Sequence, residues 1–368
     1  MVAICLGAGS LGLNACVFDG RGVGASDRGS WPDASMPELS AGDRSIDVAP
    51  SDLSPGDDVA VHDTRPADTL SPDMLSSDTL SPDTLSPCAS CGLLSCNVSQ
   101  SRCNRLRPAN IDLATITMAW PVATASCRIV ANGSVNGETG RLGACRSPGA
   151  EGTAPGGVYW KRIVQPGTGT KVALFVVDSL TVDAGLVLKG EGGLPIVIVG
   201  RKTLVIRGTI DVGATHGTAG PGGGAGGASD GADAATCRGH GGYGGSTAQS
   251  SYDSGGGGGG WGGAGGRGGA GGYSVSGGSA GSGLPNDPLI PLFGGCGGGA
   301  GGGASGGGAG GAGGGALQLS ATERIEIASL GLIRASGGGG LGGENLRAGG
   351  GGGSGGSILI ETPTFIWA

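Results

Sequence analysis

The sequence predicts an all-β fold, a short right-handed parallel β-solenoid with glycine-rich insertions that are either polyglycine-II-like or disordered. Two observations predict it. Short apolar pairs recur between Lys171 and Val212, and the same order of pairs returns after a long glycine-rich stretch. A disordered N-terminal tether and a small disulfide-rich segment are expected to precede the solenoid.

The two members of each apolar pair stand two positions apart, so both members point to one side of a short strand. The pairs are Leu180/Val182, Leu186/Leu188, Ile196/Ile198, Leu204/Ile206 and Ile210/Val212. Strands this short cannot fold alone and must stack on one another.

The strands also repeat as a set. Residues 193–213 give strand, corner, strand, corner, strand; residues 315–335 give the same order, and a third copy begins at Gly356. Each copy is interpreted as one coil. The glycine-rich tracts 213–315 and 337–356 then become insertions at one equivalent corner of a single domain, 166–368.

Composition limits the alternatives. The chain has 88 Gly in 368 residues, 4% aromatic and 14% charged residues, which is unlike an ordinary globular domain. The formal net charge of −7 gives no basis for nucleic-acid binding. Past the N-terminus no apolar run is long enough to span a bilayer as a helix.

The N-terminus reads MVAICLGAGSLGLNAC, and its Leu-Asn-Ala-Cys ending resembles the lipobox of bacterial lipoproteins. That resemblance implies a signal peptide over residues 1–16, cleavage before Cys16, and a lipid on Cys16 that anchors the chain to a membrane. The sequence departs from the pattern in lacking a basic n-region and in having Asn at the second small position. The alternative is an apolar N-terminus without a role in export.

Residues 17–87 form a predicted disordered acidic linker rich in Asp, Ser and Pro. They hold fourteen acidic residues against four arginines, and residues 68–87 repeat a DTLSP-like pentad. One Leu in five residues fits neither a helix nor a strand, and the prolines favour extended chain. We therefore expect residues 17–87 to form a solvated stalk.

Residues 88–165 are predicted to be a cysteine-rich neck or cap. With an export signal, disulfides are the favoured interpretation, and their pairing stays open. A zinc or redox role for the CxxC of Cys88 and Cys91 lacks a second ligand pair or a nearby His. The segment resembles cysteine-rich stretches of secreted proteins from myxobacteria-like organisms over about 25 residues. The disulfide candidates are Cys88, Cys91, Cys96, Cys103, Cys127, Cys145, Cys237 and Cys296.

The larger insertion contains one regular block. Residues 259–273 read GGW, GGA, GGR, GGA, GGY, a period that matches the three residues per turn of a polyproline-II-type helix. Packed polyglycine helices and a floppy loop both remain open, because ordering glycine is entropically costly. A disulfide between Cys237 and Cys296, 59 positions apart, would offset about 4 kcal/mol of that cost.

These GGx repeats resemble the glycine-rich domains of mycobacterial surface proteins and the polyglycine layers of phage tail-tip adhesins. The resemblance covers residues 215–356 and implies extracellular exposure without implying a chemistry.

No pattern in the sequence indicates a metal, a cofactor or a nucleotide. The calcium-binding nonapeptide GGxGxDxxx is absent, Cys237 and His240 supply only two ligands, and no glycine run precedes Lys-Ser/Thr. The charged residues of the strands are spaced singly, Asp211 beside Arg207 being the nearest to a pair.

The sequence therefore predicts a non-enzymatic protein, lipid-anchored at the outer membrane or secreted, with a structural or adhesive role. The partner would be a cell-surface or polysaccharide ligand. Aromatic side chains anchor interfaces, so Trp261, Tyr273, Tyr243 and Tyr252 are the contact candidates, each with packing against the solenoid as its alternative. Two other functions stay open: a polysaccharide-cleaving β-helix enzyme, and ice or mineral binding by flat polyglycine faces.

Overall fold

The computed structural model describes most of the chain from residue 108 onward. The described residues are 108–229, 231–235, 237, 242–245, 253–272, 275–284, 289–303, 306–345 and 347–368, with the backbone of four short strands before residue 108. The acidic linker beyond β2 lies outside the described residues, as do Cys88 and Cys91 of the neck. The chain divides into two compact units, and the smaller one, Val23–Thr84, belongs to this undescribed part.

The described chain passes in turn through three sheets, and the strands of successive passages run parallel within each sheet. The first strand of each passage belongs to sheet I, the second to sheet II and the third to sheet III. One passage through them is called a circuit. The first circuit is β10 (Lys171–Val177), β11 (Ser179–Val182) and β12 (Val187–Glu191). The second is β13 (Ile196–Gly200), β14 (Thr203–Ile206) and β15 (Thr209–Asp211). The third is β16 (Ala316–Ala321), β17 (Arg324–Ile327) and β18 (Leu332–Arg334), and the fourth begins with β19 (Ser357–Glu361) and β20 (Phe365–Trp367).

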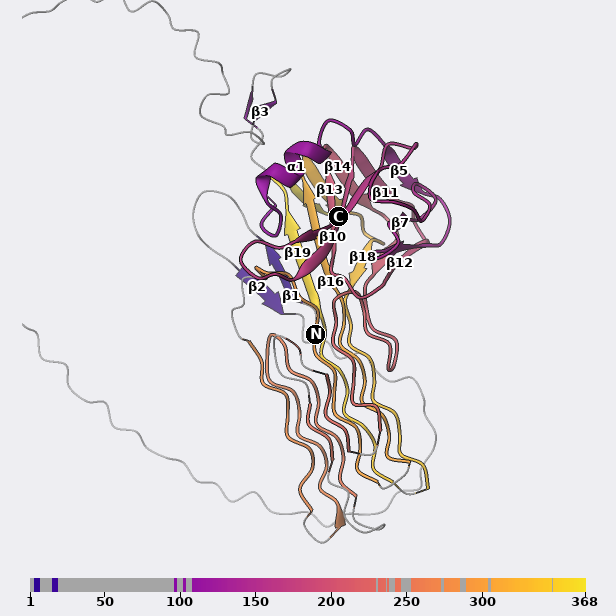
Figure 1. Cartoon of the computed structure of the whole chain (residues 1–368), viewed down its shortest axis with the longest axis vertical. Helices are drawn as coiled ribbons and strands as arrows, with labels where there is room; N and C mark the ends of the chain where they lie inside the picture. The colour runs from indigo at the N-terminus through magenta and orange to yellow at the C-terminus, as the bar shows by residue number, and fades with distance from the viewer. Residues whose placement is uncertain are drawn as a thin grey trace, which may run out of the picture. The chain divides into compact units, whose positions relative to one another are not determined.

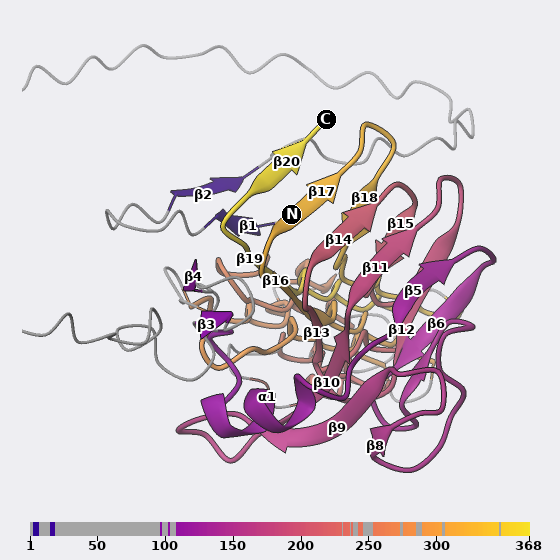
Figure 2. The ribbon, with the colours of Figure 1, turned by 90° about the horizontal axis from the view of Figure 1, so that it is seen from above.

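Successive circuits stack in register. Ile196 pairs with Leu317 in sheet I, Leu204 with Ile325 in sheet II, and Ile210 with Ile333 in sheet III. Figure 2 shows the strands of sheet II, from β5 to β20, lying side by side. The predicted all-β class and the predicted repeat of strands are confirmed: equivalent strands of the two copies are parallel neighbours.

Columns of aliphatic side chains fill the interior. Phe175, Ile198, Leu319 and Ile360 occupy one register position of sheet I, and all four are buried in the same apolar cluster. Leu180, Leu204 and Ile325 form the matching column of sheet II. Burying such side chains contributes about 1.5–3 kcal/mol each, so the core depends on this register.

Sheet I is buried on both faces. Val172, Leu174 and Val176 alternate with the interior residues of β10 and pack beneath helix α1 (Leu113–Ala119), through Ile116 and Ala119. The side chain of Asp112 accepts a hydrogen bond from Thr115 N (2.8 Å) and caps the helix. A strand covered on both faces reads as a continuous apolar run, as this one does.

A cap of short strands closes the stack before the first circuit. It comprises β5 (Ser126–Ile129), β6 (Gly133–Asn136), β7 (Arg141–Leu142), β8 (Gly152–Thr153) and β9 (Tyr159–Val164). β5 and β6 pair in parallel with β11 and β12, and β9 pairs antiparallel with β10. Trp160 of β9 is buried with its ring 6.5 Å from that of Phe175. The cap thus covers edges that would otherwise be unpaired.

Four short strands precede the described neck. They are β1 (Ala3–Leu6), β2 (Ala15–Phe18), β3 (Cys96–Asn97) and β4 (Arg102–Cys103). β1 pairs in parallel with β19 and antiparallel with β2, while Cys96 and Cys103 lie opposite each other in the β3–β4 pair. Among the residues that the structure describes, no helix has the length and apolarity needed to cross a bilayer.

Candidate binding surface in the glycine-rich insertions

Both glycine-rich insertions leave sheet III and return to sheet I. The larger lies between β15 and β16, and the smaller between β18 and β19. Figure 1 shows their chain as long segments without strand arrows, running side by side below the sheets. The prediction of one equivalent corner agrees with this connectivity.

Hydrogen bonds between neighbouring segments recur every third residue. The N–H groups of Gly295, Gly298 and Gly301 donate to the carbonyl oxygens of Gly314, Gly311 and Gly308, at 2.7–2.8 Å. This spacing is the period of a polyproline-II-type helix, which makes no hydrogen bonds within itself and must find them in its neighbours. The segments therefore satisfy one another's backbone groups.

Residues one position further along bond to a different neighbour. Gly299 N donates to Gly257 O and Gly302 N to Ser254 O, on a segment other than the one that Gly298 contacts. Each helix of this kind is thus surrounded by partners, and we call the assembly of hydrogen-bonded segments the glycine bundle. Of the two alternatives left open by the sequence, the described residues favour packed polyglycine helices.

The two insertions form one bundle. Gly311 N donates to Gly351 O and Gly308 N to Ala348 O, while Gly338 N donates back to Ala312 O, each at 2.7–2.9 Å. The bundle joins the sheets through Gly315 N, which donates to Val212 O at 2.8 Å. Hence it extends the stacked circuits as a hydrogen-bonded continuation of their backbone.

At many glycines inside the bundle the packing leaves no room for a side chain. A Cβ added at Gly298 would lie 2.2 Å from Gly351 O, and one added at Gly301 would lie 2.0 Å from Ala348 O. Real Cβ atoms do not approach backbone oxygen so closely, so glycine is required at these positions. The bundle gains backbone hydrogen bonds and close contacts in place of apolar burial.

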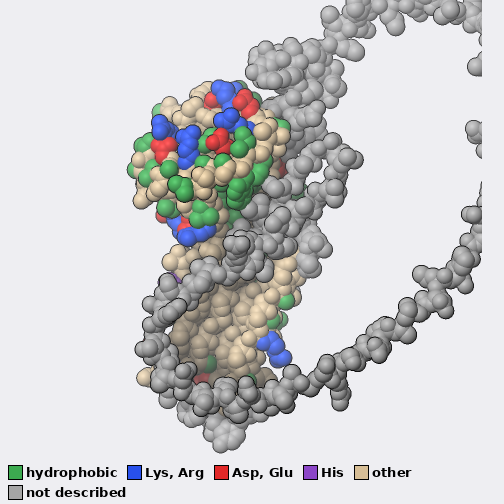
Figure 3. All heavy atoms as spheres, turned by 180° about the vertical axis from the view of Figure 1, so that it is seen from behind, with side chains coloured by type: hydrophobic (Ala, Val, Ile, Leu, Met, Phe, Trp, Pro, Cys, Tyr) green, Lys and Arg blue, Asp and Glu red, His purple; other side chains and the backbone are tan. Residues whose placement is uncertain are grey.

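The period-three block carries an open face. Added Cβ atoms at Gly265 and Gly268 would meet Gly258 O and Gly255 O at 2.2 and 2.0 Å, whereas those at Gly263, Gly266 and Gly269 would meet nothing within 4 Å. One glycine row therefore packs inward and the next faces solvent. On the side of the molecule seen in Figure 3, the part of the bundle that is not hidden is mostly tan, with few coloured side chains. This glycine face is the candidate binding surface.

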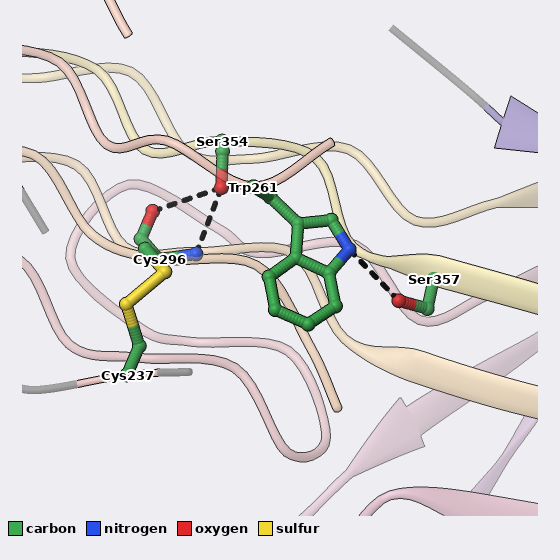
Figure 4. Close-up of a disulfide and its surroundings, with 5 residues drawn as sticks. All are labelled: Cys237, Trp261, Cys296, Ser354 and Ser357. Atoms are coloured by element: carbon green, nitrogen blue, oxygen red, sulfur yellow. Dashed lines mark hydrogen bonds between the residues drawn. A yellow bond between two sulfur atoms is a disulfide. The ribbon is translucent and has the colours of Figure 1, made fainter. Parts of the chain in front are cut away.

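Trp261 differs from its expected role. Its indole is only 7% exposed and lies in a cluster with Leu289 and Cys296. Its Nε1 donates to Ser357 Oγ at 2.9 Å, as Figure 4 shows. The side chain therefore joins the bundle to β19 and is unavailable to a partner; packing, the alternative considered for it, is the arrangement observed.

The other contact candidates separate into two groups. Tyr243 is 47% exposed on the bundle, consistent with a contact role that nothing yet tests. Tyr252 and Tyr273 lie outside the described residues.

Among the residues that the structure describes, two disulfides link predicted cysteines. Cys127 is bonded to Cys145 within the cap, and Cys237 to Cys296 within the bundle. Cys296 N also donates to Ser354 Oγ at 2.8 Å, which ties this bridge to the smaller insertion (Figure 4). Cys16 lies in β2 opposite Cys5, with its side chain outside the described part, so its lipidation remains a prediction.

Asp211 lies in a charge cluster, which corrects the expected neighbour. Lys189, Asp211 and Arg334 share one register position of sheet III, and Asp211 Oδ2 lies 3.3 Å from Lys189 Nζ and 3.1 Å from Arg334. Burial alone would raise the pKa of Asp211, but bonds from Gly213 N and Arg334 and the charge of Lys189 hold it below its ordinary value. Asp211 is thus a buried structural ion-pair member rather than part of a solvated face with Arg207.

Sequence reasoning missed a partly buried, hydrogen-bonded carboxyl at Glu361. Its oxygens accept hydrogen bonds from Ala109 N (3.0 Å), Gln318 Nε2 (2.7 Å) and Ser320 Oγ (2.8 Å). Burial raises the pKa of Glu361 despite these bonds. The sequence held one signal for this site. Gln318, Ser320 and Glu361 are polar residues at positions of sheet I that are apolar in the earlier circuits and face away from the interior. Through these hydrogen bonds Glu361 joins Ala109 of the neck to the third and fourth circuits.

Metal ligation has no basis among the described side chains, which hold no group of three His, Cys, Asp or Glu suited to an ion. Comparisons with protein families, with curated proteins and with solved structures find no match to this chain.

Proposed function

We propose that the chain is an exported cell-surface protein with a structural or adhesive role, binding through its glycine-rich insertion. The stacked circuits are interpreted as a right-handed parallel β-solenoid, which supports the bundle as a rigid base. The in-register pairing of equivalent strands supports this interpretation.

The observation that carries the proposal is the open glycine face. The surface of a folded domain ordinarily consists mainly of side chains, yet the row of Gly263, Gly266 and Gly269 presents bare backbone. Ala264, Arg267 and Ala270 donate backbone hydrogen bonds to no other described residue. Regularly spaced polar groups on a flat, rigid surface favour contact with another extended surface.

Blocking that face tests the role. We expect the double variant Gly266→Trp/Gly269→Trp, displayed on cells as the full chain, to reduce adhesion several-fold, because its side chains cover the face without meeting the bundle. Gly149→Trp is the matched control, since it too has nothing within 4 Å but lies in the cap. Equal adhesion by both variants and the unchanged chain would contradict the proposal.

Anchoring is a separate part of the proposal. A lipobox-like Leu-Asn-Ala-Cys places the modified residue at Cys16, at the outer membrane or a comparable surface. Metabolic labelling with an alkyne fatty acid should mark the unchanged chain and leave Cys16→Ala unlabelled. Labelling that persists in Cys16→Ala would remove the lipid anchor from the proposal.

The polysaccharide-cleaving alternative is tested on the same protein. Its candidate acid, Asp211, forms ion pairs with the side chains of Lys189 and Arg334, and a carboxylate held in this way is poorly suited to donate a proton. The measurement is the release of reducing ends from polysaccharides. Release by the unchanged chain that is lost in Asp211→Asn would favour the enzyme over the adhesin.

A further inference from the structure

A groove of about 520 Å³ lies where the bundle meets the turn between β9 and β10. It is lined by Thr168 of that turn, residues 222–224 and Gly294 of the bundle, Cys237, and the pair Pro291 and Phe293. Its volume falls within the roughly 300–1,000 Å³ typical of small-ligand sites.

The wall formed by Pro291 and Phe293 is held in place from behind. Leu292, between them, is fully buried against the outer face of sheet I. The buried side chain of Gln165 makes two hydrogen bonds to the backbone of Leu292: Nε2 donates to Leu292 O (3.0 Å), and Oε1 accepts from Leu292 N (2.6 Å). With Leu292 turned inward, its two neighbours line the groove.

The opposite side is fixed as well. Cys237 is bonded to Cys296, which lies fully buried within the bundle. The backbone of residues 222–224 is hydrogen-bonded through Gly224 N to Gly295 O and through Gly222 O to Gly294 N. A site whose walls are already ordered loses little conformational entropy on binding.

The lining selects for an uncharged ligand with one apolar side. None of the described residues that line the groove is ionisable, since Cys237 is in a disulfide. The rings of Phe293 and Pro291 offer apolar contact. The Thr168 hydroxyl, which already pairs with Thr170, keeps one further hydrogen-bonding position, and no described residue donates to the carbonyl oxygens of Gly223 and Gly294. A wholly apolar ligand would leave these two carbonyl oxygens without a partner, at a cost in free energy.

We propose that this groove binds a neutral glycan, one sugar ring resting its C–H face on Phe293 and Pro291 while its hydroxyls meet Thr168 and the glycine backbone. The inference rests on the proposed adhesive function and names the ligand class for it. A proline-rich peptide also has uncharged, ring-bearing faces, but it has few donors for the backbone carbonyls of the groove, so the glycan is favoured.

The test is calorimetric titration of the full chain with maltohexaose, cellohexaose and chitohexaose, alongside hexagalacturonate and decaproline. We expect binding of at least one uncharged hexasaccharide. Thr168→Arg, on an exposed turn, should fill the groove and weaken that binding at least about tenfold, as should Phe293→Ala. Thr364→Arg, exposed at the far end of sheet II, should leave it unchanged.

Three results would overturn the inference: no uncharged hexasaccharide binds, Thr168→Arg and Thr364→Arg bind equally, or only hexagalacturonate or decaproline shows Thr168-dependent binding. Thr168→Arg keeps the test decisive if Phe293→Ala unfolds. Adhesion that requires the open glycine face but not Thr168 would overturn the groove and preserve the proposed function. Groove binding without any cellular adhesion would support the groove and contradict the surface role.

Discussion

Single glycines in the bundle differ according to the direction in which the missing Cβ would point. At Gly298 that direction leads into Gly351 O, and at Gly266 it leads into open space, although both belong to runs of similar sequence. The effect of a methyl group should therefore depend on position rather than on composition.

Substitution by alanine measures this difference. Gly298→Ala should destabilise the bundle by about 1–3 kcal/mol, because backbone segments must move apart. Gly266→Ala should be neutral or stabilise by about 0.4–1 kcal/mol, through reduced freedom of the unfolded chain. Denaturant unfolding of the two variants provides the comparison, and equal effects at both positions would refute close packing.

Glu361 is the residue whose charge state matters for stability. Its pKa is raised by burial, so the folded chain holds the proton more tightly than the unfolded chain, whose ordinary value is 4.5. The stability that this group contributes is fully present below that value and is lost as the pH rises through the folded pKa.

Glu361→Gln removes this titration. We expect the melting temperature of the variant, relative to the unchanged chain, to rise as the pH increases from 4 to 7. Glu323→Gln, at an exposed carboxyl, serves as the control and should show no such trend. Parallel melting profiles for Glu361→Gln and the unchanged chain would show that burial does not perturb this carboxyl.

At the scale of elements, the bundle and the circuits draw on different forces. The circuits bury aliphatic columns such as Leu180, Leu204 and Ile325, whereas the bundle relies on backbone hydrogen bonds and the Cys237–Cys296 bridge. A loop of 59 residues closed by a disulfide is stabilised by about 4 kcal/mol on the chain-entropy model.

Removing that bridge should therefore loosen one element and spare the other. In Cys237→Ser/Cys296→Ser, amide exchange across residues 294–303 should accelerate strongly, while Leu204 and Ile325 keep their protection. Cys127→Ser/Cys145→Ser, which opens the cap, should leave the bundle amides unaffected. Unchanged exchange in the first variant would show that hydrogen bonding alone orders the bundle.

The sequence predicted the circuits better than it predicted their surroundings. Period-two pairs and their repetition make Leu204 and Ile325 equivalent positions of successive copies, and the two residues are paired because register follows directly from the repeat. The continuous apolar run from Val172 to Val177 did not reveal what covers the outer face of sheet I. That face is covered by α1, which comes from a distant segment whose sequence shows no repeat matching the strands.

The candidate surface was harder to predict for a physical reason. Glycine has no side chain, so a run of glycines shows no alternation of polar and apolar residues. Nothing in the sequence therefore distinguishes the packed row of Gly265 from the open row of Gly266, or shows that Trp261 points inward. Likewise, the entropic cost of ordering glycine can be weighed against hydrogen bonds only when the partners are known.

For the described part of the larger unit, one design principle connects sheets and bundle. Each insertion occupies the corner between sheet III and sheet I. The bond from Gly315 N to Val212 O holds the two ends of the larger insertion together, and the bond from Gly356 N to Ala335 O holds those of the smaller. Stacked circuits thereby set the spacing of the glycine helices, and the bundle in turn presents the open face and the groove. The proposed contacts depend on this transmission of register.

Residue-resolved amide exchange of the full, oxidised chain tests this account most directly. It predicts protection at Gly295, Gly298 and Gly301, whose N–H groups are bonded within the bundle, and rapid exchange at Ala264, Arg267 and Ala270 on its outer segment. Rapid exchange at all six, with the strand amides still protected, would contradict an ordered glycine bundle and every contact proposed from it.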